Sequence, residues 1–209
     1  MKNIINIKIG VFFTLLFFLP LNIFASNFVL SDDGLIDKRA IQKIEEIGTE
    51  SKNKLAVNIY VYVKQSLSLE KNILTKDKIK YIKKYEKDIA NSLVKPYVLF
   101  TMAVEDTHVN LIVSSELQEV IDKNEILNDY VVPLLASKDK NSTFAKASAA
   151  ILNGYAAIAD TIAQSKNIKL ESSIGSAGKV ASTIWKVLMY TLIVVGLLFY
   201  IYAVLRRKK

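Results

Sequence analysis

Two acidic pairs in turns are the side chains whose type and spacing best suit chemistry. Asp32 and Asp33 precede the first expected helix, and Glu105 and Asp106 lie between two expected strands. Carboxylates grouped on loops suit a hard cation such as Ca²⁺, which binds several oxygen ligands. The same residue types are common in turns and at helix N-termini, and spacing alone favours that local role. Asp33, Glu105 and Asp106 are therefore kept as candidate metal ligands, with Ca²⁺ as the candidate cofactor.

Most other catalytic chemistry is excluded by residue type. The sequence has no cysteine, which removes disulfides, thiolate metal sites and cysteine nucleophiles. It also lacks the glycine-rich phosphate loops GxxxxGK[ST] and GxGxxG and the nucleophile motif GxSxG. His108 is the only histidine, and we interpret it as a surface or hydrogen-bonded residue near a turn of the sheet. No catalytic residue is assigned.

Asn141 lies in a sequence that could be modified. The tripeptide Asn141-Ser142-Thr143 is an N-glycosylation acceptor. Asp139, two residues before the asparagine, makes it resemble the extended acceptor of periplasmic glycosylation systems. A polar loop followed by a helix cap explains the same residues equally well.

Hydrophobic periodicity indicates the elements that would position these side chains. Apolar residues that recur every three or four positions predict amphipathic helices over 37–52 and 76–93, and the lysines of 76–93 are interpreted as a solvated face. Further helices are expected over 124–135 and 142–164. Strands are expected over the β-branched and aromatic runs 55–63, 97–104 and 108–113, the last two forming a hairpin. Strands interspersed with helices predict an α/β fold, a three-layer α/β/α sandwich with a small central sheet, plus one C-terminal transmembrane helix.

The N-terminal end has the layout of a signal peptide. In residues 1–25, two lysines precede an apolar run over 11–19, and Ala25 is the expected last residue removed. An uncleaved N-terminal anchor is the alternative, although the apolar run is short for a membrane span.

The C-terminal end predicts a single membrane span. Residues 187–205 contain 19 residues without a charge, and as a helix they would reach about 28 Å, close to the hydrocarbon thickness. Trp185 at one edge and the basic residues 206–209 at the other place the C-terminus in the cytoplasm. The expected organisation is signal peptide 1–25, exported domain 27–165, linker 166–184, transmembrane helix 185–205 and cytoplasmic tail 206–209. We therefore expect a single-pass protein of the cell inner membrane with its domain in the periplasm or another extracytoplasmic space.

The excess of basic over acidic residues is located mainly at the two ends of the chain. The formal charge is +8, but seven of the 28 basic residues lie in the two terminal segments, whereas all 20 acidic residues lie between them. The middle of the chain is thus nearly neutral, which argues against a nucleic-acid partner.

The order of elements and two acidic motifs resemble the TPM domain family over roughly residues 27–165. The matching motifs are Asp33-Gly34 before the first helix and Glu105-Asp106 between two strands. Thr107 stands where the family usually has a basic residue, and the stretch 114–118 lacks the glycines usual there. The resemblance implies an exported α/β/α domain. It also implies either a supporting role in a membrane complex or, as in one family member, acid phosphatase activity.

Two function classes follow. We favour a non-catalytic, membrane-anchored interaction module that assists an envelope protein or complex. The alternative is a Ca²⁺-dependent, acid phosphatase-like hydrolase that uses Asp33, Glu105 and Asp106, with the cation polarising a phosphoryl oxygen. That alternative also needs a phosphate clamp or a nucleophile, for which the sequence offers Lys95, Thr107, His108 and Ser114.

Overall fold

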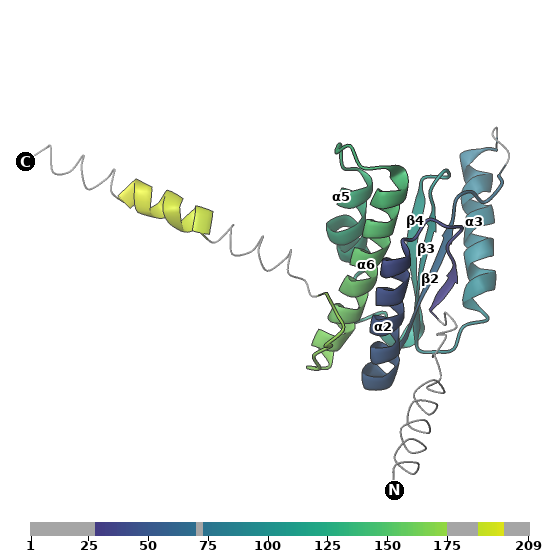
Figure 1. Cartoon of the computed structure of the whole chain (residues 1–209), viewed down its shortest axis with the longest axis horizontal. Helices are drawn as coiled ribbons and strands as arrows, with labels where there is room; N and C mark the ends of the chain where they lie inside the picture. Colours follow the sequence, from purple (N-terminus) through teal and green to yellow (C-terminus); the bar gives the residue numbers. More distant parts are fainter. Residues whose placement is uncertain (1–27, 70–72, 175–187, 199–209) are drawn as a thin grey trace, which may run out of the picture.

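The fold is built on a four-stranded sheet in which the first three strands are parallel (Figure 1). The computed structural model describes residues 28–69, 73–174 and 188–198. The strands lie in chain order: β1 (Val29–Ser31), β2 (Asn58–Lys64), β3 (Tyr97–Ala103) and β4 (His108–Val113). β4 runs antiparallel to β3 and forms the expected hairpin with it.

Strand β3 is the centre of the sheet. It pairs with β2 from Asn58↔Tyr97 to Lys64↔Ala103 and with β4 from Val98↔Val113 to Ala103↔His108. All seven of its residues are buried. A strand covered on both faces is expected to be apolar almost throughout, which explains why the sequence of β3 shows no alternation.

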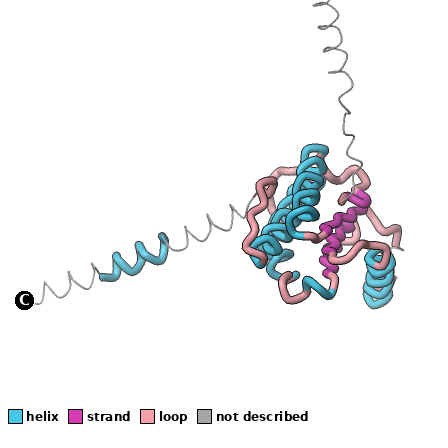
Figure 2. The backbone as a smooth tube through the Cα atoms, turned by 90° about the horizontal axis from the view of Figure 1, so that it is seen from below, coloured by secondary structure: helices cyan, strands magenta, loops and turns pink. Residues whose placement is uncertain are grey.

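Helices cover both faces of the sheet (Figures 1 and 2). The long helices α2 (Lys38–Leu55) and α6 (Thr143–Ser165) pack on one face, and α3 (Thr75–Ala90) packs on the other. Side-chain caps set the start of two of them, because Asp37 accepts from the Arg39 amide and Ser142 from the Ala145 amide. The parallel strands follow in order while their connecting helices α2 and α3 lie on opposite faces. The two crossovers therefore have opposite hands, and one departs from the usual right-handed form.

The main core lies between the sheet and the pair α2 and α6. Tyr155 of α6 is fully buried there, and its hydroxyl donates to the carbonyl of Ile59 at 2.8 Å. Gly154 allows α6 to approach β3 closely, since an added Cβ would lie 2.8 Å from the ring of Phe100. A smaller cluster under α3 contains Tyr97 and Leu99.

The expected helix over 124–135 is a succession of three short turns. α4 (Lys123–Ile126) is followed by the π-helical η2 (Leu127–Val131) and by α5 (Val132–Leu135), after the 3₁₀ turn η1 (Ser115–Leu117). The amide of Val132 donates to the carbonyl of Leu127, five residues earlier. Pro133 follows and has no N–H with which to continue an α-helical ladder, which accounts for the irregularity.

The terminal predictions lie largely outside the described residues. Residues 1–25 are not described, and of the expected transmembrane helix 185–205 only 188–198 are, as a helical segment. Within the described part of the chain, no helix combines the length and the apolar character needed to cross a membrane.

The first residues of the expected linker are held against the domain. Leu170 is buried, and the Glu50 carboxylate of α2 accepts the amides of Glu171 and Ser172 at 2.8 and 2.7 Å. The ordered contacts thus continue beyond residue 165 to residue 172.

Candidate functional site

The three candidate acids gather at the carboxyl end of the sheet. β1, β2 and β3 are parallel, so the loops that follow them emerge at the same edge, where α/β proteins commonly bind ligands. Asp33 follows β1, and Glu105 and Asp106 follow β3. The segment after β2, residues 65–67, lies between them and is bonded to all three acids.

Asp33 and Glu105 meet on either side of Gln65. One oxygen of Asp33 accepts from Lys64 Nζ at 2.8 Å, and the other accepts from the Gln65 amide at 3.1 Å. These two bonds, that from Lys64 above all, lower the pKa of Asp33, and the same ion pair raises the pKa of Lys64. Glu105 accepts from the Gln65 side-chain amide at 2.7 Å, while its own amide donates to the Gln65 carbonyl at 2.9 Å.

Asp106 fixes the next part of the same loop. Its Oδ2 accepts from the Leu67 amide at 2.7 Å, and its side chain is 10 % exposed. Lys78 of α3 donates to the Asp106 carbonyl at 2.9 Å and lies 3.6 Å from Oδ1. The carboxylate therefore links the β3–β4 turn both to the loop after β2 and to α3.

Both carboxylate oxygens of Asp33 and of Asp106 thus face protein donors, as does one oxygen of Glu105. In the part of the chain that the structure describes, no three His, Asp or Glu side chains come together as a group that could hold a metal ion. The Ca²⁺ site remains a prediction. What the arrangement visibly does is brace three loops against one another at one edge of the sheet.

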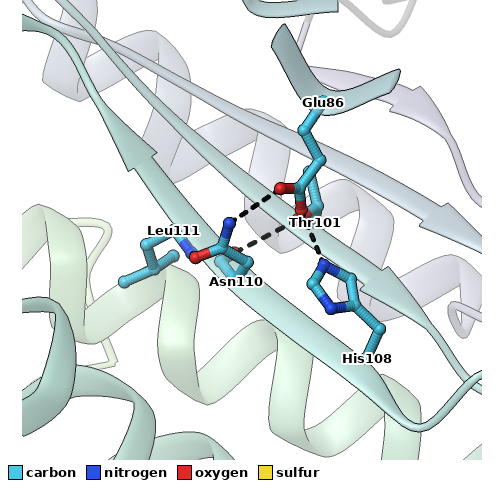
Figure 3. A network of polar contacts seen from close by, with 5 residues as sticks. All are labelled: Glu86, Thr101, His108, Asn110 and Leu111. Carbon is cyan, nitrogen blue, oxygen red and sulfur yellow. Dashed lines mark hydrogen bonds and ion pairs between the residues drawn. The ribbon is translucent and has the colours of Figure 1, made fainter. Parts of the chain in front are cut away.

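A second polar cluster lies next to this edge, under α3 (Figure 3). Glu86 projects from α3 with only 7 % of its side chain exposed. Its Oε1 accepts from Thr101 Oγ1 at 2.5 Å and lies 2.7 Å from His108 Nε2, and its Oε2 accepts from Asn110 Nδ2 at 2.8 Å. Three donors from β3 and β4 therefore converge on one buried carboxylate.

The electrostatics of the Glu86 cluster keep the carboxylate charged. Burial raises the pKa of Glu86, but the hydrogen bonds from His108, Thr101 and Asn110 outweigh it, and the net pKa lies below the usual value of 4.5. His108 then donates through Nε2 to the ionised carboxylate. The interpretation of His108 as a hydrogen-bonded residue is confirmed, and the cluster joins α3 to the sheet.

Two groups considered for phosphate chemistry lie elsewhere. Ser114 and Lys95 flank the amino end of β3, where Ser114 Oγ accepts from the Tyr97 amide at 3.0 Å. They are at the opposite end of the sheet from Asp33, Glu105 and Asp106, because β4 returns antiparallel to its start. Of the four residues offered for phosphate chemistry, only Thr107 and His108 lie beside the acids. The expectation that Lys95 and Ser114 lie there too was wrong.

Asn141 lies in the exposed loop before α6. Its amide donates to Asp139 at 3.0 Å, and Ser142 caps the helix. The residue is thus accessible, and its glycosylation stays a prediction.

Sequence reasoning missed Glu86, although a signal was present. Glu86 stands four residues after Ile82 and four before Ala90, on the inward face of α3. Thr101 is the one aliphatic hydroxyl residue within the largely apolar β3, and His108 and Asn110 share one face of β4. Polar residues at buried positions on facing elements are expected to pair.

Comparisons with known proteins support the fold alone. No protein-family model matches the sequence, and no curated protein matches it. A solution NMR structure of the N-terminal domain of a protein from P. gingivalis is similar, with a TM-score of 0.51 at 13% sequence identity. The similarity covers 70% of this chain and 88% of that one. At this identity the shared property is the α/β architecture.

Proposed function

We propose that this chain is a TPM-type interaction module, anchored in the cell inner membrane, whose domain binds and assists an envelope protein or complex outside the cytoplasm. The order of elements follows the family layout, and the fold is shared with a solved bacterial domain. The uncharged segment 187–205 and the basic residues after it support the anchor and its orientation.

The observation that carries the proposal is the bracing at the carboxyl end of the sheet. Asp33, Glu105 and Asp106 each fix the backbone or side chain of residues 65–67. Loops held in this way form a defined surface, and a preorganised surface loses little conformational freedom when a partner binds. A hydrolytic role would require these carboxylates to exchange their protein donors for a cation or a proton.

The test is variant-dependent capture of a partner. The full chain, tagged and cross-linked in native membranes, is solubilised in detergent and purified with its partners. Glu105→Lys reverses an exposed charge at the braced edge, and Glu119→Lys makes the same change at an exposed site beyond β4. We expect the partner to be lost with Glu105→Lys and retained with Glu119→Lys. Equal recovery with both variants, or none with the wild type, would contradict the proposal.

A further inference from the structure

The outer face of α3 carries a continuous stripe of lysines. Five of them recur at the spacing i, i+4, i+7, i+8 and i+11, which places them on one side of a helix. We call the following residues the lysine stripe: Lys76, Lys80, Lys83, Lys84 and Lys87. All five are exposed, and from first to last they extend over about 16 Å at the rise of an α-helix.

Among the described lysines of the domain, those of the stripe differ from five others in forming no ion pair, and they differ from the remaining unpaired lysines in standing together on one helix face. Lys43, Lys54, Lys64, Lys78 and Lys146 each form an ion pair with a carboxylate. Among the described residues, none of the stripe lysines has such a pair within 4 Å. The exposed acids of α3, Asp77 and Asp88, lie toward one flank of the stripe. With five lysines against these two acids, the exposed face of α3 has an excess of positive charge.

Large apolar side chains are exposed on the same element. Ile79 is 48% exposed and Tyr81 45%, and Leu74, which precedes the helix, is 72% exposed. None of the three is buried, and the buried residues of α3 are Ile82, Glu86 and Ala90. The Tyr81 ring stacks on that of Tyr85 and leaves its outer side exposed. Lysines interleaved with exposed apolar and aromatic groups are typical of surfaces that contact anionic lipid headgroups.

We propose that the lysine stripe docks α3 onto the anionic headgroups of the membrane that carries the chain. The inference rests on the anchoring stated under Proposed function. Ten residues, 175–184, separate residue 174 from the expected span, and at full extension they reach at most about 36 Å. A domain tethered so closely meets the lipid surface at high effective concentration, so that even weak electrostatic contacts are occupied. An acidic protein offers the stripe the same charge but lacks this tether.

The experiment places a probe beside the stripe in the full chain. Because the sequence has no cysteine, Asn91→Cys at the exposed end of α3 gives a single labelling site for a fluorophore. The labelled chain is incorporated into nanodiscs of phosphatidylcholine, with or without about one third phosphatidylglycerol, that contain a headgroup-attached quencher. We expect at least a twofold stronger quenching in the anionic discs. It should fall to the neutral-disc level at 1 M salt, where the Debye length is about 3 Å.

Two matched triple variants distinguish an effect of the lysine stripe from an effect of the net charge of the chain. Lys80→Gln, Lys83→Gln and Lys87→Gln together remove three charges from the stripe. Lys52→Gln, Lys138→Gln and Lys140→Gln remove three from exposed sites elsewhere. The first set should abolish the lipid-dependent quenching and the second should leave it unchanged. Equal quenching in both lipids, or equal effects of both sets of variants, would overturn the inference. So would stripe variants that change only the binding of soluble poly-glutamate and leave the lipid-dependent quenching as it was.

Failure of the anchor itself gives a different result. A chain that does not enter the discs contradicts the proposed topology, whatever the stripe does. In that case the same proteins are mixed with preformed vesicles of the two compositions. Flotation with anionic vesicles that the stripe variant alone loses would still support lipid docking, and its absence would overturn it.

Discussion

At the scale of single residues, Glu86 carries the most consequential interactions of the described fold. One buried carboxylate receives donors from Thr101, His108 and Asn110. Hydrogen bonds to a charged group are worth more than neutral ones, and a buried donor left without an acceptor is costly. The cluster therefore decides how firmly α3 is held on the sheet.

Glu86→Gln should destabilise the domain by about 1–3 kcal/mol. The amide keeps the shape of the side chain but loses the charge, and its NH₂ group faces residues that are themselves donors. Urea unfolding followed by circular dichroism measures the change. Asp88→Asn, on the exposed side of the same helix, is the control and should change stability by less than about 0.5 kcal/mol. Similar losses for the two variants would show that the cluster does not hold α3.

Glu86→Gln should also reduce the loss of folding stability at acid pH. The folded pKa of Glu86 lies below its ordinary value of 4.5, so its stabilising contribution is fully present above pH 4.5 and is lost as pH falls through the folded pKa. Glu50 acts in the same direction: burial raises its pKa, but Lys54, Ser172 and backbone amides lower it to about 2. Unfolding free energies measured from pH 6 to pH 2 should therefore decline less in Glu86→Gln than in the wild type. A parallel decline would contradict the assignment.

For the acids at the sheet edge we expect weak or absent Ca²⁺ binding and no appreciable phosphatase turnover. Asp33 and Asp106 already accept from Lys64, Gln65 and Leu67, and a cation would have to displace these donors. A bound ion at a hundredfold excess over its Kd would stabilise the fold by about 2.7 kcal/mol. Thermal unfolding in Ca²⁺ or EDTA, with hydrolysis of a generic phosphomonoester, measures both properties. Metal-dependent stabilisation and turnover that Asp106→Asn abolishes would replace the interaction module with the hydrolase.

At the scale of elements, hydrophobic periodicity correctly predicted the three long helices, whose apolar faces pack on the sheet. The helices 37–52, 76–93 and 142–164 are observed as Lys38–Leu55, Thr75–Ala90 and Thr143–Ser165, because each has an apolar face long enough to define a period. β1 was missed because it has three residues, too few for any pattern. The acids were correctly expected in turns, but their pairing with residues 64–67 depends on strand order, which local spacing does not encode.

Close packing between α6 and the sheet makes Gly154 sensitive to a single methyl group. An added Cβ would lie 2.6 Å from Val131 Cγ2 and 2.8 Å from Phe100 Cε1. We expect Gly154→Ala to destabilise the domain by about 1–3 kcal/mol, as overpacking does, despite the better helix propensity of alanine. Gly196→Ala is the matched control, since an added Cβ there meets nothing within 4 Å. Thermal unfolding of both variants measures the effect, and a Gly154→Ala protein as stable as its control would show that the interface adjusts freely.

At the scale of the whole molecule, charge is divided by position along the chain. Seven basic residues occupy the two terminal segments, and the residues between them are nearly neutral in sum. Within that neutral part the lysine stripe concentrates positive charge on α3, while acids accumulate at other sites such as Glu45, Glu46 and Glu50 of α2. The overall balance therefore conceals a strongly polarised distribution, in which the termini and one helix face carry the basic character.

This distribution predicts the topology of the chain. We expect the proposed N-terminal export signal and the basic cluster 206–209 to place the residues between them outside the cytoplasm. A periplasmic reporter fused at Gly178 should therefore be active, and a cytoplasmic reporter fused after Lys209 should be active. Reversing the tail with Arg206→Glu, Arg207→Glu, Lys208→Glu and Lys209→Glu should weaken this orientation, because retention of basic residues on the inner side is what fixes it. A cytoplasmic reporter active at Gly178, or a periplasmic one active after Lys209, would contradict the topology and remove the tether on which docking of the lysine stripe depends.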